Sequence, residues 1–231
     1  MSRPRRETKS HSSAEPLVIG VLASGRGSNL QSIIDGIEQG KLAARVGVVL
    51  SNKKEAQALE RATQHHIPAL FVDPSLYPDR SRYDTEIIQL LQVHHVELVV
   101  LAGYMRLLTT LLIDRFPNRI INIHPSLLPA FPGMYAHRQA LSHGVKVSGC
   151  TIHFVDEKVD HGAIIAQAAV PVLEGDDEAS LSERILQEEH RLLPQVLQLY
   201  ASGKLRIDGR KVSLERENLA KDGTVSLQVN R

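Results

Sequence analysis

Cysteine and aromatic residues are scarce in this sequence of 231 residues. It contains one cysteine, Cys150, no tryptophan, and only five tyrosines and four phenylalanines. A single cysteine excludes an internal disulfide framework and every zinc site that is built on a CxxC motif. A chain without disulfides suits the reducing cytosol, so we expect a cytoplasmic protein.

Long hydrophobic runs and an excess of one charge are also missing. The longest apolar runs, at residues 17–23 and 98–102, are far shorter than the roughly 20 residues that cross a bilayer. The 27 basic and 26 acidic residues leave a formal net charge of +1. This balance argues against binding to nucleic acid or to an acidic membrane surface, because both attract a strongly basic protein. We therefore expect small-molecule partners, and neither nucleic acid nor a membrane.

Metal-binding motifs are not found in the sequence. There is no HExxH motif and no carboxylate-rich calcium loop. The pairs His65–His66 and His94–His95 are unsuited to one ion, because adjacent residues on a helix point in different directions. Cys150 and His153 are three residues apart in strand-like sequence and hence point to opposite faces, which argues against a Cys–His nucleophilic pair. We expect no metal, and a buried, apolar role for Cys150.

The two ends of the chain are polar. Residues 1–16 contain four basic and two acidic residues and no apolar segment, which argues against a secretory signal. Arginine and serine would suit an organelle transit peptide, but Glu7 and Glu15 count against one. We predict a disordered tail at residues 1–16 and a loose tail at 216–231.

The first half alternates strand-like and helical patterns. Residues 17–23 form a continuous β-rich apolar run, which is typical of a strand buried on both faces. The apolar residues Leu30, Ile33, Ile34 and Ile37 then recur at helical spacing. Further strands are predicted at residues 46–50, 69–72, 97–102 and 119–123, and further helices at 55–65 and 79–93. This alternation predicts an α/β fold, with a Rossmann-like, mostly parallel twisted sheet and helices on both faces.

The second half has a different pattern. Residues 147–155 and 163–172 are strand-like and are joined by a short link, which favours an antiparallel pair. Residues 178–200 predict a long helix in two parts, because Pro194 lies inside it. Residues 205–212, with Asp208-Gly209 at their centre, predict a hairpin.

A glycine-rich segment, SGRGSN at residues 24–29, separates the first strand from the first helix. Glycines allow a tight turn and close approach of a ligand, and the N–H groups of a helix N-terminus attract an anion. A dinucleotide site would need a third glycine where Leu30 stands, and a P-loop would need Gly-Lys-Ser/Thr. The loop therefore suits a monophosphate. The alternative is a plain tight turn in which Ser28 or Asn29 caps the helix.

Asn122 and His124 come at the carboxyl end of the fifth predicted strand, where ligands bind in open α/β sheets. They are two residues apart and so point to the same face. An imidazole can transfer a proton and an amide N–H can stabilise an oxyanion, which suits a tetrahedral intermediate at a carbonyl. His124 could instead merely end the strand. A carboxylate beside it would raise its pKa, but the spacing does not decide between Asp156, Glu157 and Asp160.

Several long motifs resemble one family over about residues 17–212. They are ASGRGSNLQSII, LAGYMRLL, INIHPSLLPAFPG followed by AHRQAL, GCTIHFVDEKVDHGAIIAQAAVPV, and QEEH. In this order they are similar to motifs of the phosphoribosylglycinamide formyltransferases of purine biosynthesis. The resemblance implies formyl transfer from 10-formyltetrahydrofolate to the amine of glycinamide ribonucleotide, with no metal. It also implies a nucleotide/phosphate-binding half at residues 17–115 and a folate-binding and catalytic half at residues 116–215.

The resemblance assigns site residues by position. The implied catalytic residues are Asn122, His124 and Asp160. The implied ribonucleotide ligands are Gly27, Ser28, Asn29 and Glu189. The implied folate ligands are Arg80, Met105, Arg106, Leu107, Leu108 and Asn122. A cis bond is implied at Leu128-Pro129.

Two residues depart from the family pattern. Arg26 stands where many relatives have a small or amide residue, and Tyr135 stands where some have a histidine. Related enzymes offer alternatives: methionyl-tRNA formyltransferase adds a C-terminal domain, and formyltetrahydrofolate deformylase adds an N-terminal one. We expect neither addition here, because about 25 residues follow Gly203 and 16 precede residue 17. A non-catalytic nucleotide-binding module is a further alternative. We expect a monomer or a homodimer.

Overall fold

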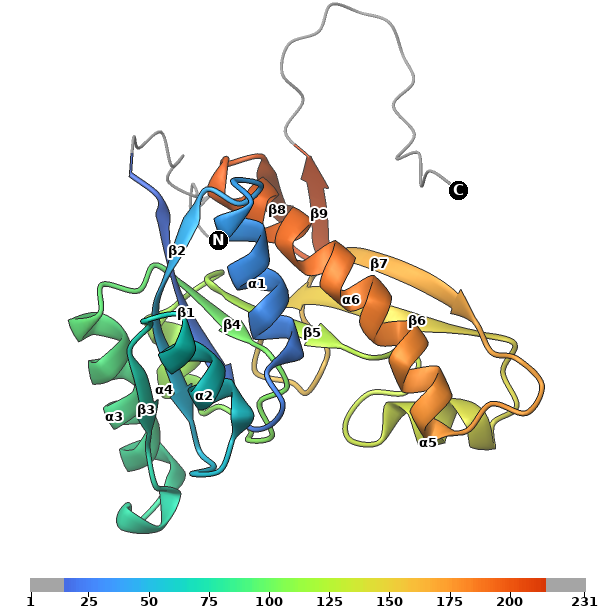
Figure 1. Cartoon of the computed structure of the whole chain (residues 1–231), viewed down its shortest axis with the longest axis horizontal. Helices are drawn as coiled ribbons and strands as arrows, with labels where there is room; N and C mark the ends of the chain where they lie inside the picture. The colour runs from blue at the N-terminus through green and yellow to red at the C-terminus, as the bar shows by residue number, and fades with distance from the viewer. Residues whose placement is uncertain (1–14, 215–231) are drawn as a thin grey trace, which may run out of the picture.

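The computed structural model describes residues 15–214, so the predicted tails lie almost wholly outside the described residues. Within this range one mixed sheet runs through the protein in the order β3-β2-β1-β4-β5-β6-β7-β9-β8 (Figure 1). Its strands are β1 (Leu17–Ala23), β2 (Ala44–Ser51), β3 (Ala69–Phe71), β4 (Leu98–Leu101), β5 (Ile120–His124), β6 (Val147–Phe154), β7 (Ile164–Pro171), β8 (Leu205–Asp208) and β9 (Lys211–Leu214).

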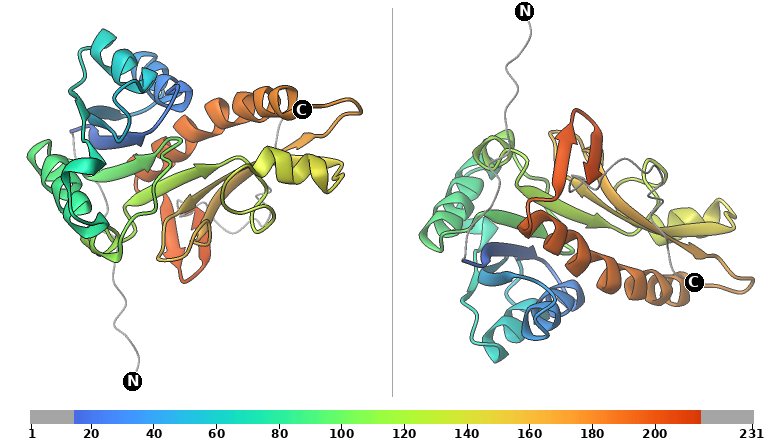
Figure 2. Two further views of the ribbon diagram at one scale, coloured as in Figure 1. Left: turned by 90° about the horizontal axis from the view of Figure 1, so that it is seen from below. Right: turned by 90° about the horizontal axis from the view of Figure 1, so that it is seen from above.

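Helices cover both faces of the sheet, as predicted. They are α1 (Ser28–Glu38), α2 (Gln57–Gln64), α3 (Arg80–Val93), α4 (Thr110–Arg115), α5 (Ala136–Ser142) and α6 (Glu178–Ala201), with a short 3-10 helix at Pro74–Leu76. Figure 2 shows α1 and α6 on one side of the sheet and α3 on the other. Every residue of β1 is buried. Ile19 and Val21 join the core under α1 and α6, and Leu22 joins the core under α3. The apolar run of β1 therefore reflects burial on both faces.

β5 is the strand at which the sheet changes from parallel to antiparallel. It pairs with β4 in parallel and with β6 in antiparallel orientation. β6 and β7 form the predicted antiparallel pair. The hairpin β8–β9 joins β7 through the single residue pair Ile164↔Lys211. The predicted boundary at residue 116 falls between β4 and β5, inside one continuous sheet, and the division into two functional halves stays a prediction.

Helix α6 corrects one prediction. It is a single helix of 24 residues with Pro194 inside it, not a helix in two parts. Proline removes one backbone donor from a helix interior, but packing on both sides of this position holds the helix together. Leu193 and Val196 are buried, and a Cβ on Gly36 of α1 would lie 3.2 Å from the Pro194 Cβ. The close contact between α1 and α6 therefore runs through the proline.

The short helices α4 and α5 were not predicted, and the hairpin turn lies slightly later than expected, with Gly209 at φ 59° between β8 and β9. His66 and His95, which follow α2 and α3, adopt positive φ and end those helices. Cys150 is buried, as expected. No helix within residues 15–214 is long and apolar enough to span a membrane, and no group of metal-ligating side chains occurs in that range.

Candidate active site

The glycine-rich loop turns from β1 into α1 through Gly27. Gly27 has φ 71°, and a Cβ there would lie 2.7 Å from the Cα of Ala58 in α2. The Ala58 N–H donates to the Gly25 carbonyl at 3.1 Å, so the loop rests on the start of α2. In the described part of the chain no side chain caps α1. The alternative in which Ser28 or Asn29 caps this helix is therefore wrong, and the first-turn N–H groups remain available to an anion.

A buried amide–carboxylate pair joins this loop to α6. The Asn29 Nδ2 donates to Glu189 Oε2 at 2.8 Å, and only 8% of Asn29 and 4% of Glu189 are exposed. Burial raises the pKa of Glu189 to about 7, against the opposing effect of the Asn29 hydrogen bond. The Asn29 Oδ1 is buried and has no hydrogen-bond partner among residues 15–214. The Asn29 Oδ1 can thus accept a hydrogen bond from a ligand.

Asn122, His124 and Asp160 meet at the carboxyl end of β5. The Asp160 Oδ2 lies 3.3 Å from His124 Nδ1, and the Asn122 Nδ2 donates to Asp160 Oδ1 at 3.3 Å. Asp160 comes from the turn between β6 and β7 and also accepts a hydrogen bond from the Gly133 N–H at 2.7 Å. Asp156 instead contacts His161 at 2.8 Å. Of the alternatives that the spacing left open, Asp160 is therefore the acid beside His124.

His153 is a member of this cluster that the sequence did not reveal. The register of β5 and β6 places His153 opposite Asn122, and the Asn122 Nδ2 donates to His153 Nε2 at 3.1 Å. His153 Nδ1 lies 2.8 Å from the Phe154 carbonyl, which makes Nδ1 the protonated nitrogen. The antiparallel pair was predictable, but its register was not. The available signal was that His153 and Thr151 are two residues apart in β6 and therefore lie on the same face of the strand.

The surroundings of His124 and Asp160 determine which of the two carries a charge. Burial lowers the pKa of His124, although the Phe131 carbonyl at 2.8 Å from Nε2 and the Asp160 carboxylate both act to raise it. Burial alone would raise the pKa of Asp160, but its contacts with His153, the Gly133 N–H and His124 outweigh burial and lower it. The unliganded site therefore favours an ionised Asp160 beside a neutral His124.

The loop after β5 is held in one shape by hydrogen bonds to β6. Leu128-Pro129 is cis, as the family resemblance implies. Thr151 Oγ1 donates to the Ser126 carbonyl at 2.6 Å and accepts from the Leu128 N–H at 3.0 Å. Farther along, Phe131 and Tyr135 have φ values of 53° and 61°, and Asp160 has 47°. These left-handed residues lie around the cluster, where backbone strain is often found at functional sites.

Apart from Asn122, the residues expected to bind folate lie on α3 or in the segment after β4. Leu101, the last residue of β4, pairs with Asn122, so the chain that follows begins beside the cluster. Arg106 stacks over the Tyr83 ring at 4.5 Å. Burial raises the pKa of Asp84, while the charges of Arg106 and Arg80 act to lower it. Both arginines therefore lie near Asp84, whereas Met105, Leu107 and Leu108 are at least partly exposed in the same segment.

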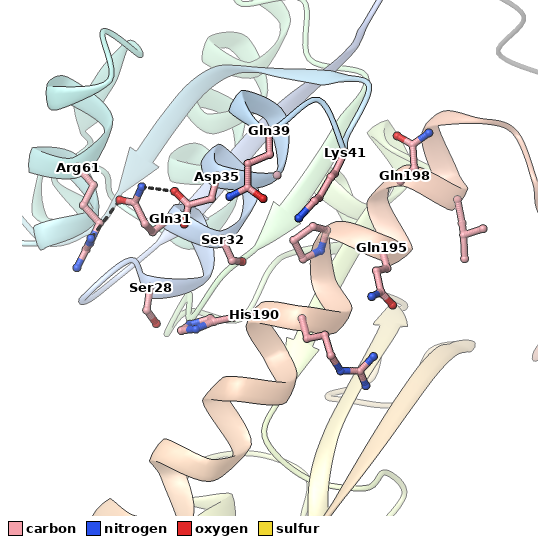
Figure 3. A pocket seen from close by; sticks show the side chains of 14 residues that line it. Ser28, Gln31, Ser32, Asp35, Gln39, Lys41, Arg61, His190, Gln195 and Gln198 are labelled. Carbon is pink, nitrogen blue, oxygen red and sulfur yellow. Dashed lines mark hydrogen bonds between the residues drawn. The ribbon is translucent and has the colours of Figure 1, made fainter. Parts of the chain in front are cut away.

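A cavity of about 860 Å³ lies between α1 and α6 rather than over the cluster. Figure 3 shows Ser28 and His190 at one end of it and Lys41 and Gln198 at the other. Arg61 extends from α2 and donates to the Arg26 carbonyl at 2.9 Å. The side chain of Arg26 is exposed. The cavity touches the glycine-rich loop but does not include Asn122, His124 or Asp160.

These features define an α/β enzyme, with an anion-attracting helix N-terminus and an amide–imidazole–carboxylate cluster at one edge of its sheet. Residues 18–197 match the model of the Formyl transferase family. The chain belongs to this family.

Curated relatives of two lengths are similar to this chain. The phosphoribosylglycinamide formyltransferase of Escherichia coli is 40% identical over 89% of this chain and 97% of its own length. The trifunctional purine biosynthetic protein adenosine-3 of Drosophila pseudoobscura is 46% identical over 88% of this chain. The chain spans only 15% of that protein, and 19% of the human one.

Solved structures agree with the fold. The structure of glycinamide ribonucleotide transformylase 1 from Symbiobacterium toebii is 52% identical, with a TM-score of 0.86 over 90% of this chain and 99% of that one. A formyltetrahydrofolate deformylase from Pseudomonas syringae is 29% identical, with a TM-score of 0.79, and this chain covers 66% of it. The mixed sheet with helices on both faces is thus the fold of these structures.

Proposed function

We propose that this protein transfers the formyl group of 10-formyltetrahydrofolate to the amine of 5-phosphoribosylglycinamide, a step of purine biosynthesis. The observation that carries the proposal is that Asn122 and His124 each lie 3.3 Å from the Asp160 carboxylate. Family membership over residues 18–197 and the relatives named phosphoribosylglycinamide formyltransferase support it.

The chemistry proceeds by direct attack. The neutral amine nitrogen of the ribonucleotide forms a bond to the formyl carbon, and the carbonyl electron pair moves onto oxygen. Re-formation of the carbonyl breaks the bond to the folate nitrogen, and the proton lost by the amine passes to that nitrogen through water held by Asp160. No covalent enzyme intermediate is needed, and the folate is a substrate that leaves as tetrahydrofolate.

Asn122 and His124 act as the donors to the oxyanion. In the unliganded structure the Asn122 amide donates to Asp160 and His153, and His124 Nε2 faces the Phe131 carbonyl. Substrate binding has to redirect at least one of these donors. Because burial lowers the pKa of His124, the free enzyme holds a neutral imidazole. The negative charge that develops on the substrate oxygen favours its protonation, and the nearby Asp160 carboxylate stabilises the imidazolium.

The two substrates bind on separate loops at this edge of the sheet. The ribonucleotide phosphate binds at the uncapped start of α1, on Gly27, Ser28 and Asn29, and Glu189 binds the same substrate. The folate binds along Met105–Leu108 with Arg80. Holding both reactants side by side lowers the barrier by as much as about 7–11 kcal/mol. We further propose that the protein is cytoplasmic, acts on small molecules only, and is a monomer or a homodimer.

A coupled spectrophotometric assay for folate release tests the proposal. We expect release of tetrahydrofolate that depends on 5-phosphoribosylglycinamide and is absent with water as the only acceptor. Asn122→Ala should lower turnover by roughly 10²–10³-fold, the typical effect of removing one oxyanion donor. Release at the same rate without the ribonucleotide would identify a deformylase and contradict the proposal. Binding of the ribonucleotide without transfer would favour a non-catalytic module.

A further inference from the structure

The segment that follows β4, residues 103–109, lacks regular structure but makes contacts with its surroundings near both ends. At its far end, the Thr109 N–H and Oγ1 both donate to Asp84 Oδ2 at 2.7 Å. From the second residue of the segment, the Tyr104 hydroxyl donates to that of Tyr83 at 3.2 Å. These contacts tie the segment to α3. The contact at its near end leads elsewhere, to the glycine-rich loop.

Ser24 makes that near-end contact through both its backbone and its side chain. Its N–H donates to the Gly103 carbonyl at 3.1 Å, which continues the ladder between β1 and β4 one step beyond the strands. Its hydroxyl accepts from the Met105 N–H at 2.8 Å and donates to Asn52 Oδ1 at 2.6 Å. Asn52 is itself buried. One hydroxyl therefore connects the first residue of the glycine-rich loop with the segment after β4 and the turn after β2.

The Ser24 hydroxyl accepts one hydrogen bond and donates another, and the direction of each is fixed by its partner. Because the Met105 N–H can only donate, the Ser24 oxygen has to accept from it, and the hydroxyl proton is then directed at Asn52. An alanine at position 24 would leave the Met105 N–H and the Asn52 oxygen without these partners. It would not remove any packed side chain from the core, because Ser24 is only partly buried. The expected effect is therefore local to the two loops.

We propose that Ser24 is a positioning residue that holds the segment 103–108 against the glycine-rich loop, so that the folate-binding segment is preformed beside the phosphate loop. The inference rests on the proposed function for the nature of the two ligands. Ser24 acts through Met105 and the loop backbone, and it is not itself a catalytic residue. Its hydroxyl sets the distance between the two binding loops.

Three variants test this role. Ser24→Ala removes the hydroxyl, and Ser24→Thr retains it. Ser51→Ala is the matched control, because Ser51 ends the neighbouring strand β2 and is buried, and within residues 15–214 its hydroxyl bonds only to the Lys53 carbonyl and N–H, at 2.9 and 3.0 Å. Steady-state kinetics with each substrate varied in turn should give a KM for 10-formyltetrahydrofolate about tenfold higher in Ser24→Ala. We expect a smaller rise in the ribonucleotide KM, a kcat within about threefold of wild type, rescue in Ser24→Thr, and no change in Ser51→Ala.

Amide hydrogen exchange without any substrate provides a second measurement. In Ser24→Ala, exchange should accelerate in residues 103–108 and 25–28 together and remain unchanged in β1 and β5. Kinetics and exchange that match those of Ser51→Ala, or acceleration throughout the sheet, would overturn the proposal. Failure of the wild type to formylate 5-phosphoribosylglycinamide would refute the proposed function instead, and the exchange data would still decide the role of Ser24.

Discussion

The glycine-rich loop and the loops around Asp160 lie at the same edge of the sheet. They differ in which residue types adopt the left-handed backbone conformation. In the first, the left-handed residue is Gly27, which adopts φ 71° without a side-chain penalty. In the second, Gly133 is left-handed too, but so are three residues with side chains, Phe131, Tyr135 and Asp160. A phosphate site made from backbone N–H groups can use glycine. The proposed mechanism requires a carboxylate at position 160, so glycine cannot relieve the strain there.

The two regions also differ in how completely their polar groups are satisfied. Asp160 contacts His124, Asn122 and the Gly133 N–H. Near the glycine-rich loop, by contrast, the Asn29 Oδ1 has no partner among the described residues, and burial raises the pKa of Glu189. In the proposed mechanism, the groups around Asp160 therefore already have partners before substrate binds, whereas the ribonucleotide supplies the missing partner near the glycine-rich loop. Four substitutions test this contrast.

Asp160→Asn should have the largest effect, a loss of turnover on the order of 10³-fold. Asparagine tolerates the left-handed backbone and can still accept from the Gly133 N–H, so the fold should persist. What is lost is the negative charge beside His124. Steady-state kinetics and circular dichroism of the purified variant measure both expectations.

Asp156→Asn is the matched control for this variant. It lies in the same turn but contacts His161 at the surface, so turnover should stay near wild type. Near-wild-type turnover in Asp160→Asn, or equal losses in the two variants, would refute the assigned role of Asp160.

Gly27→Ala should have the second-largest effect. The new Cβ would meet the Ala58 backbone at a left-handed position, which costs roughly 1–3 kcal/mol of stability and displaces the loop. We expect the ribonucleotide KM to rise by about 10- to 100-fold, with the folate KM much less affected. Gly25→Ala is the control, since a Cβ there has nothing within 4 Å. If both variants behave alike, the loop does not depend on the conformation of Gly27.

Glu189→Gln should change stability in a pH-dependent way. Because the pKa of Glu189 is raised from 4.5 to about 7, the folded state binds more protons than the unfolded state between these values. The free energy of unfolding contributed by this group therefore falls as the pH rises from about 4.5 to 7. Urea unfolding should show a flatter profile in the variant and, at pH 8, extra stability on the order of 2 kcal/mol. Parallel profiles would contradict the assignment. Weaker ribonucleotide binding should accompany the gain.

Tyr135→Gly should have the smallest effect. Tyr135 is 61% exposed at φ 61°, and glycine removes the left-handed penalty, for a gain of about 0.5–1 kcal/mol. Its ring stacks on the exposed Arg138, at 5.1 Å. Thermal unfolding should show a melting temperature higher by a few degrees, with turnover unchanged. Tyr135→Phe keeps the backbone strain and should melt like the wild type. A large loss of turnover in both variants would show that the ring acts in catalysis.

Much of the fold and of the candidate site was predictable from the sequence. What was not predictable has physical reasons. The run 17–23 and the spacing of Leu30, Ile33 and Ile34 are repeated local signals, so β1 and α1 were correctly predicted. The turn between β1 and α1 was predictable as well, because Gly27 is a glycine and glycine favours tight turns. The helices α4 and α5 contain only six and seven residues, too few for a periodic pattern to emerge. The place of His153 in the cluster was not predictable, because its contact with Asn122 is set by strand register, which depends on residues 31 positions apart.

The position of β5 in the sheet determines how Asn122 and His124 respond to heating. β5 is hydrogen-bonded along both sides, to β4 and β6, whereas the hairpin β8–β9 is attached to β7 by one residue pair. Detaching β5 would require the sheet to split, but the hairpin can separate with few bonds lost. On heating, the hairpin should therefore become susceptible to protease first, and inactivation should coincide with cooperative melting of the whole domain.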